Sequence, residues 1–269
     1  MAVRPRGRST GPFVGVVALA IVAGVASYDF FLADPGVEEA PSRAERPASA
    51  PSAVDAAPDP APDPPVSLDE SDGIVRHLVV KLSSHPGLAA WLIPDDLVRI
   101  FVVVVDNVAD GHTPDRHLTP WRPTRRFRTT GSSRELHVDP VSHARYDTHA
   151  EIVAAIEPAV AAELYHHFRP LIAAAYAELG RTGDEFDATV LRALRNLLET
   201  PVLEREVRLI HRAPFFEFAD PALEDLLPVQ KQFLGMGPRN VRAVQASLLE
   251  IAEAIGFDLA NLPAPEVLR

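Results

Sequence analysis

Apolar residues recur at helical spacing through most of the chain after residue 66. A capping box at residues 67–70 is followed by Ile74, Leu78 and Leu82, each four residues apart, which predicts an amphipathic helix that ends near residue 84. The same spacing predicts further helices at residues 158–179, 186–197 and 238–255, with Pro170 expected to kink or split the first of these. The pattern therefore indicates a mainly α-helical domain.

Residues 94–109 are ambiguous. They open with Pro94 and two aspartates, as a helix start does, and they stop before Gly111. Their centre, residues 100–105, is an unbroken and mostly β-branched apolar run, which a buried strand would also show. The length and the start signal favour a buried central helix, with a strand as the alternative.

Two short pairs of extended segments separate the helices. Residues 127–130 and 135–138 flank a Gly-Ser-Ser turn, which predicts a β-hairpin. Residues 207–210 and 215–218 form a second candidate hairpin, which Pro214 should confine to the edge of a sheet. We expect one or two small β-hairpins within the helical domain.

The N-terminal pattern is of another kind. Three arginines within residues 1–12 precede the apolar run 13–26, which continues through aromatic residues to Leu32. Residues 13–32 are long enough to cross about 30 Å of hydrocarbon, whereas the shorter run also suits a cleaved signal peptide. The aromatic residues favour an uncleaved transmembrane anchor with the basic tail in the cytoplasm. The rest of the chain is then delivered to the far side of the membrane.

Residues 34–66 cannot form a packed core. They contain nine prolines and seven acidic residues and no aromatic residue, which predicts a disordered, extended linker. The residues from 67 onward carry 21 basic and 29 acidic side chains, a net charge of −8, which argues against nucleic acid as a partner. We predict a compact multi-helix domain at 67–262 and a C-terminal tail at 263–269.

Several motifs of the domain resemble a known family. In chain order they are Leu68-Asp69-Glu70-Ser71-Asp72, Trp91-Leu92, Val104-Val105-Asp106-Asn107, Ala144-Arg145-Tyr146, Tyr176-Ala177-Glu178-Leu179-Gly180, Phe218-Ala219-Asp220-Pro221 and Met236-Gly237-Pro238-Arg239-Asn240. They are similar to a bacterial family known as domain of unknown function 3014. The resemblance implies a single-pass protein of the Gram-negative inner membrane with a proline-rich linker and a periplasmic domain, and it implies no activity. Ser142-His143 departs from the expected Asn-Tyr, which argues against a site built on His143.

The residue types that act in catalysis or metal binding form few recognised motifs in this sequence. The chain has no cysteine and no Gly-x-Ser-x-Gly motif, which excludes thiolate chemistry and gives no sign of a serine nucleophile. Glu163 and His166 have the spacing of a di-iron ligand pair, but such sites need a second pair, which the sequence does not contain. We predict no catalytic residue, no metal and no cofactor.

A glycine-rich turn is the candidate anion-binding site. Gly235 and Gly237 precede Arg239 and Asn240, so that the backbone could approach a phosphate and the next helix could offer its N-terminal amides. A tight turn between two helices requires the same residues, which is the structural alternative.

Two polar sets are candidates for one buried network or binding cleft. Asp106 and Asn107 follow the most apolar segment, and Arg145, Tyr146 and Asp147 follow the first hairpin. Support of the fold is the alternative role, because a carboxylate and an amide can cap a helix end and Arg145 can neutralise an acid.

The candidate protein interface is a basic segment with one tryptophan. It consists of Trp121, in the proline-rich stretch 111–123, with Arg122, Arg125, Arg126 and Arg128. Trp and Arg are enriched at interface hot spots. The sequence therefore predicts a membrane-tethered domain that binds another envelope protein, and small residues in the anchor also permit a homo-oligomer. An envelope enzyme, with or without a metal, or an anion-binding domain is the alternative.

Overall fold

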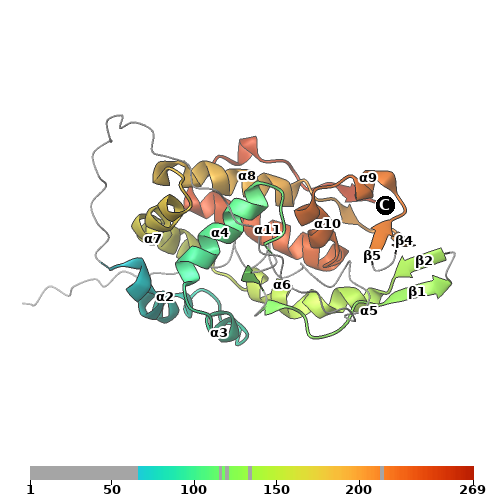
Figure 1. Ribbon diagram of the computed structural model, residues 1–269, viewed down its shortest axis with the longest axis horizontal. Helices are drawn as coiled ribbons and strands as arrows, with labels where there is room; N and C mark the ends of the chain where they lie inside the picture. The colour runs from blue at the N-terminus through green and yellow to red at the C-terminus, as the bar shows by residue number, and fades with distance from the viewer. Residues whose placement is uncertain (1–65, 115–116, 119–120, 133–134, 213–214) are drawn as a thin grey trace, which may run out of the picture.

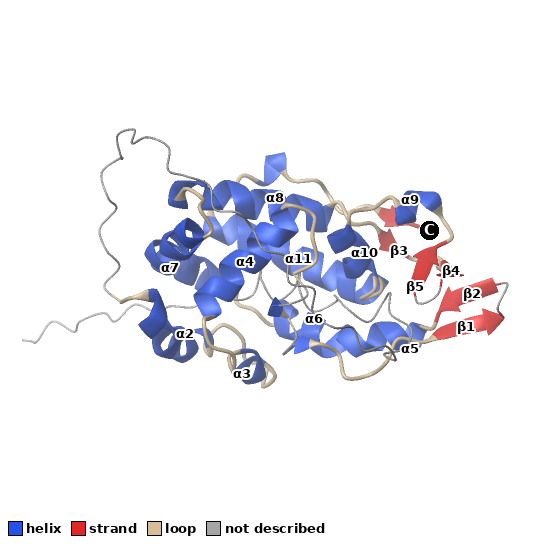
Figure 2. Ribbon diagram, in the orientation of Figure 1, coloured by secondary structure: helices blue, strands red, loops and turns tan. Residues whose placement is uncertain are grey.

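A helical body with a small strand lobe at one end makes up the described part of the chain (Figures 1 and 2). The computed structural model describes residues 66–114, 117–118, 121–132, 135–212 and 215–269. The predicted mainly α fold with small antiparallel hairpins is confirmed. The predicted tail, anchor and nearly all of the linker lie outside these residues, and every helix within them is too short or too polar to cross a bilayer.

Four long helices form the centre of the body: α4 (Leu97–Ala109), α7 (Pro158–Glu178), α8 (Phe186–Leu198) and α11 (Pro238–Ile255). Helix α4 packs against both α7 and α8, and α11 packs against α7. Seven side chains of α4 are buried, which explains why its sequence is apolar on nearly all sides. The helical interpretation of residues 94–109 is confirmed, and the strand alternative is wrong.

Shorter helices cover the ends of this centre. They are η1 (Leu68–Glu70), α2 (Ser71–Val79), α3 (Leu88–Trp91), α5 (Pro140–His143), η4 (Ala144–Tyr146), α6 (Asp147–Ala154), η5 (Gly183–Glu185), α9 (Pro221–Glu224), α10 (Pro228–Leu234) and η6 (Leu259–Asn261). The first helix is shorter than predicted, and the Ser67 hydroxyl binds the Glu70 carboxylate where a backbone cap was expected. Pro170 lies inside a single continuous α7, so the predicted split is wrong.

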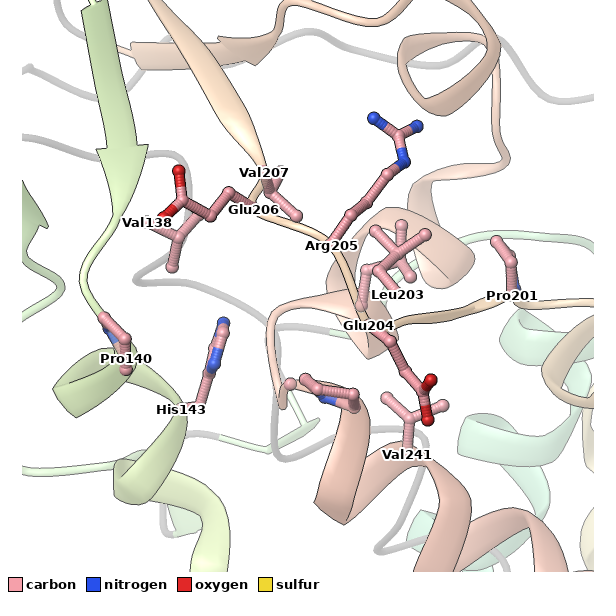
Figure 3. A pocket seen from close by; sticks show the side chains of 13 residues that line it. Val138, Pro140, His143, Pro201, Leu203, Glu204, Arg205, Glu206, Val207 and Val241 are labelled. Atoms are coloured by element: carbon pink, nitrogen blue, oxygen red, sulfur yellow. The ribbon is translucent and has the colours of Figure 1, made fainter. Parts of the chain in front are cut away.

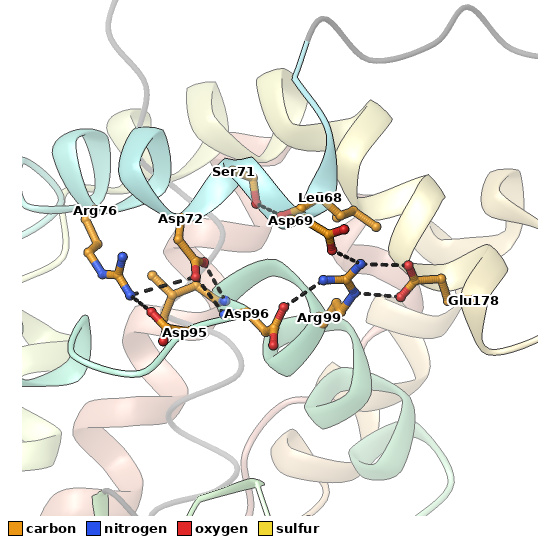
Figure 4. A network of polar contacts seen from close by, with 10 residues as sticks. Leu68, Asp69, Ser71, Asp72, Arg76, Asp95, Asp96, Arg99 and Glu178 are labelled. Atoms are coloured by element: carbon orange, nitrogen blue, oxygen red, sulfur yellow. Dashed lines mark hydrogen bonds and ion pairs between the residues drawn. The ribbon is translucent and has the colours of Figure 1, made fainter.

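An Asp72 carboxylate from α2 caps the start of α4 (Figure 4). Its two oxygens accept hydrogen bonds from the backbone amides of Asp96, at 2.8 Å, and Leu97, at 2.9 Å. Asp96 has φ of 60°, which turns the chain sharply into the helix. Three carboxylates, those of Glu178, Asp69 and Asp96, surround the Arg99 guanidinium and raise its pKa. These contacts tie the first helices of the domain to α4 and α7.

Both predicted hairpins form, and they join into one sheet. The strands are β1 (Thr129–Ser132), β2 (Glu135–Val138), β4 (Arg208–Arg212) and β5 (Phe215–Phe218), all antiparallel in the order β1-β2-β4-β5. Leu136 pairs with Leu209 where the two hairpins meet. Val138, Leu209 and Phe218 are buried in a small hydrophobic cluster beneath the sheet, which is separate from the large core of the helical body.

A second, two-stranded sheet holds the C-terminal segment. Strand β6 (Val267–Leu268) runs parallel to β3 (Val202–Leu203). The Val202 amide donates to Glu266 O at 2.8 Å, and the Glu204 amide donates to Leu268 O at 2.9 Å. The segment predicted as a free tail at 263–269 is therefore paired along part of its length.

Side-chain amides from neighbouring helices satisfy the buried C-terminal ends of α4 and α8. Gln245 on α11 is 1% exposed, and its Nε2 donates to Leu197 O at 3.0 Å and to Thr200 O at 2.8 Å. Asn196 on α8 donates to Val108 O at 2.8 Å and to Ala109 O at 3.1 Å. The last carbonyls of a helix have no intrahelical donors. These side-chain amides therefore donate the hydrogen bonds that water molecules would donate at an exposed helix end.

We expect Gln245→Met to lower the free energy of unfolding by about 2 kcal/mol, because a thioether of similar length leaves buried carbonyls without their donor. Urea unfolding followed by circular dichroism measures this change. Glu250→Met on the exposed side of the same helix is the matched control and should cost less than about 0.5 kcal/mol. Equal losses in the two variants would contradict the capping role of Gln245.

Candidate functional site

A pocket of about 270 Å³ lies where the strand lobe meets the first turn of α11 (Figure 3). Its walls come from three parts of the chain: Val138, Pro140 and His143 from β2 and α5; Pro201, Leu203, Glu204, Arg205, Glu206 and Val207 from the segment between α8 and β4; and Leu234, Gly237, Pro238 and Val241 from α10 and α11. Valine, leucine and proline side chains form most of these walls. The pocket is thus an apolar hollow with four polar side chains.

Local sequence signals set the two helix starts that frame the pocket. The Asp139 carboxylate accepts a hydrogen bond from the Val141 amide at 3.0 Å, and Pro140 occupies the first position of α5. At the start of α11, Gly237 has φ of +79° and precedes Pro238. A Cβ atom at position 237 would lie 2.4 Å from Cγ of His143, so only glycine permits the imidazole to lie against this turn.

Each of the three charged side chains on the wall lies close to another polar side chain. Glu204 binds Arg242 at 2.5 Å and Arg269 at 3.3 Å. The Arg205 guanidinium binds Asp220 and, with the Ala222 amide, lowers the pKa of that carboxyl. Glu206 lies 3.9 Å from the imidazole of His137. These pairs form a polar rim around the apolar walls.

The fourth polar wall residue, His143, is half-buried and its ring has no hydrogen-bond partner among the described residues. Burial lowers the pKa of this imidazole, and the nearby Arg145 guanidinium lowers it further, while Asp139 and Asp147 act in the opposite direction. The folded protein therefore favours a neutral imidazole at this wall.

The candidate anion-binding residues lie at or next to the pocket wall, and the polar ones already contact other groups of the same chain. Asn240 is buried, and its Nδ2 donates to Asp147 Oδ1 at 2.9 Å, to Met236 O and to His143 O. Arg239 is exposed, 3.7 Å from the Asp147 carboxylate. Gly235 ends α10, and Gly237 lies against His143. The carboxylate of Asp147 thus stands where an external anion was expected.

The two polar sets have different partners in the structure. Asp106 pairs with Arg181 at 3.2 Å, and Asn107 donates to Val103 O at 2.7 Å. The buried Arg145 donates to Ser142 O at 2.9 Å and lies over the ring of Tyr146, while Asp147 binds Asn240. Among the contacts that the structure describes, no shared network joins the two sets.

Trp121 is part of the core. Its side chain is 4% exposed and belongs to the large hydrophobic cluster, as does the nearby Leu118. Nε2 of His149 binds Trp121 O at 3.1 Å. The expectation of an accessible indole at an interface is therefore wrong, because the indole is packed into the core.

Three of the four arginines of the same segment lie at the surface. Arg125, Arg126 and Arg128 are exposed, and Arg122 is half-buried. The backbone carbonyl of Arg128 accepts a hydrogen bond from Ser142 Oγ at 2.9 Å, and its guanidinium lies 3.7 Å from Asp139. These contacts place the basic segment beside α5, the helix that contributes Pro140 and His143 to the pocket.

The sequence analysis missed the pocket itself. Its walls come from segments that are far apart along the chain. Sequence motifs indicate contacts between residues that are close in sequence, whereas Asn240 and His143 are in contact although they are 97 positions apart. The only local signals were the two helix starts, Asp139-Pro140 and Gly237-Pro238.

Comparison with known proteins gives one match. The model of a family described as a protein of unknown function, DUF3014, matches residues 97–252, a segment that includes every wall residue of the pocket. No curated protein matches the chain, and no solved structure does. Within the described part of the chain, no group of three or more histidine and acidic side chains is placed to hold a metal ion.

Burial of His143 and His149 predicts a loss of stability in mild acid. The pKa of each imidazole is lowered from 6.5, chiefly by burial, so below about pH 6.5 the unfolded chain binds protons that the folded chain does not. The free energy of unfolding should fall, by at most about 1.4 kcal/mol per pH unit for each histidine.

Urea unfolding of the parent and of His149→Phe between pH 7.5 and 5 measures this slope. Phe keeps a ring against Trp91 and cannot be protonated, so the variant should show a shallower slope. His77→Gln, on the exposed side of α2, controls for the loss of one histidine. A slope in His149→Phe as steep as in the parent would contradict the assignment.

Proposed function

The chain belongs to the DUF3014 family, whose members are described as proteins of unknown function, and we propose that it is a binding domain. In this proposal the pocket receives an apolar or aromatic side chain of a protein partner, and the surrounding surface contacts the rest of that partner. The observation that carries the proposal is the pocket with its apolar walls and paired, charged rim.

The size of the pocket favours a side chain over a cofactor. Sites for small molecules commonly enclose about 300–1,000 Å³, whereas this pocket has about 270 Å³. Burial of one large apolar side chain contributes about 1.5–3 kcal/mol, which is too little for a stable complex on its own. The partner must therefore also contact the surface around the pocket.

The basic segment beside α5 supplies such a surface. Arg125, Arg126 and Arg128 are exposed next to a pocket on a domain with a net charge of −8. A local basic edge attracts an acidic partner, whereas the net negative charge of the domain as a whole opposes the approach of a second copy. We therefore propose an acidic protein segment as the partner, with self-association as the competing outcome.

The N-terminal pattern suggests where this binding takes place. We propose that residues 13–32 anchor the chain in the inner membrane and that residues 34–66 extend the domain into the periplasm, where it binds another envelope protein. The basic tail and the length of the apolar run support this arrangement.

Filling the pocket should abolish partner binding. With a benzophenone amino acid at position 206 on the exposed rim, irradiation of the full-length chain in its native membrane should give one crosslinked partner, identified by mass spectrometry. Val207→Phe inserts a larger side chain into the pocket and should remove this product, while the melting temperature stays within a few degrees.

Val141→Phe is the matched control, because Val141 is 50% exposed and lies outside the pocket. This variant should crosslink as the parent does. A crosslink that persists in a folded Val207→Phe protein would show that the partner does not use the pocket.

A reporter that is active only in the periplasm, fused after Arg269, should be active. Replacing Arg4, Arg6 and Arg8 with glutamate removes the charge bias before the apolar run and should reduce this activity. A cytoplasmic reporter at the same position is the control. Activity of the cytoplasmic fusion in the parent chain would contradict the proposed topology.

A further inference from the structure

We propose that His143 makes the pocket selective for a side chain with a neutral hydrogen-bonding group at its tip, above all the phenol of a tyrosine. This inference rests on the proposed function and names the ligand class of the same pocket. It assigns to His143 the role of a specificity-determining residue.

His143 is the polar wall residue whose hydrogen-bonding capacity is unused. Of the four polar side chains on the wall, Glu204 and Arg205 each have a partner of opposite charge, and Glu206 lies 3.9 Å from the imidazole of His137. The imidazole of His143 has no hydrogen-bond partner among the described residues, and Figure 3 shows the ring extending from α5 into the space between the walls. A ligand in the pocket can therefore meet this ring.

The imidazole is held in place before any ligand arrives. The ring lies against Gly237, where a Cβ atom would come within 2.4 Å of it. The backbone carbonyl of His143 accepts a hydrogen bond from Nδ2 of the buried Asn240 at 3.2 Å. A fixed donor and acceptor favour binding, because little side-chain freedom is lost when the ligand binds.

The charges around the ring favour a neutral ligand group. Arg145, Asp139 and Asp147 lie near it on the side of α5 and α6, and Glu204, Arg205 and Glu206 lie on the opposite wall. Burial keeps the imidazole uncharged at neutral pH, with one nitrogen as donor and the other as acceptor. A hydroxyl can bind either nitrogen, whereas a carboxylate would also face the carboxylates of Asp139 and Asp147.

The remaining walls suit one aromatic ring. Val138, Leu203, Val207, Leu234 and Val241 provide apolar contact on several sides. An aromatic body with a polar tip is the chemistry of tyrosine, which interfaces use when one end of the side chain is dry and the other makes a hydrogen bond. Phenylalanine would leave the His143 nitrogen buried without a partner.

Toluene and p-cresol, which reproduce the side chains of Phe and Tyr, are the probes. Their affinities for the full-length protein in detergent are measured by NMR titration of methyl-labelled valine and leucine. The ratio of p-cresol to toluene affinity should fall about fivefold in His143→Leu and stay within about twofold of the parent in His143→Gln, which keeps a donor and an acceptor. Comparing ratios removes the intrinsic difference in solubility between the probes.

A further comparison uses the parent protein alone, so it holds even if a variant does not fold. 4-Methylanisole, in which the phenol hydroxyl is methylated, should bind the parent several-fold more weakly than p-cresol. An unchanged probe ratio in a folded His143→Leu, or equal binding of 4-methylanisole and p-cresol, would overturn the inference and leave the pocket as a binding site. Failure of all three probes to shift the pocket methyl signals would overturn the proposed function as well.

Discussion

The fold depends on one constraint: helices that end inside the protein must find hydrogen-bond donors for their last carbonyls. Gln245 and Asn196 meet it by donating side-chain amides across helix boundaries, to the ends of α8 and α4. Gln230 extends the chain of contacts by donating to Asn196 O at 3.0 Å. Because each amide belongs to a different helix from the carbonyl it binds, the helices fix one another's ends and relative positions. Core packing alone would allow the apolar faces to slide.

The same kind of contact positions the candidate site. Asn240 joins the first turn of α11 to His143 and Asp147, and thereby sets the distance between α11 and α5. Because Gly237 has no side chain, the His143 imidazole can lie against this turn. The space beside the two residues stays open and forms the pocket. Its walls are therefore built from the residues that hold the strand lobe and the helical body together. A binding site on such a junction is supported by rigid elements on both sides.

The sequence could predict what depends on neighbours in the chain. Helix α4 was recognised by Pro94 and the aspartates that follow it, the first hairpin by its Gly-Ser-Ser turn, and the second by two neighbouring extended segments. The pairing of β2 with β4 could not be predicted, because nothing in the sequence around Leu136 and Leu209 indicates that these two residues pair. Trp121 was misplaced for a related reason: a Trp beside arginines has the composition of an interface, and only the fold shows that this side chain lies in the core. His143 was set aside because Ser142-His143 departs from the Asn-Tyr that the family resemblance leads one to expect, and its contact with Gly237 is visible only in three dimensions.

The pairing of Leu136 with Leu209 also determines when the pocket can appear. Each hairpin closes a loop of a few residues, which takes microseconds, but joining them closes a loop of 73 positions that contains α5 to α8. Such a long closure loses more chain entropy than a local contact, so we expect it to follow the packing of the intervening helices. The pocket needs that closure, because its walls come from both sides of it. A partially folded chain therefore lacks the pocket, and a ligand that requires the pocket can recognise only molecules that have finished folding.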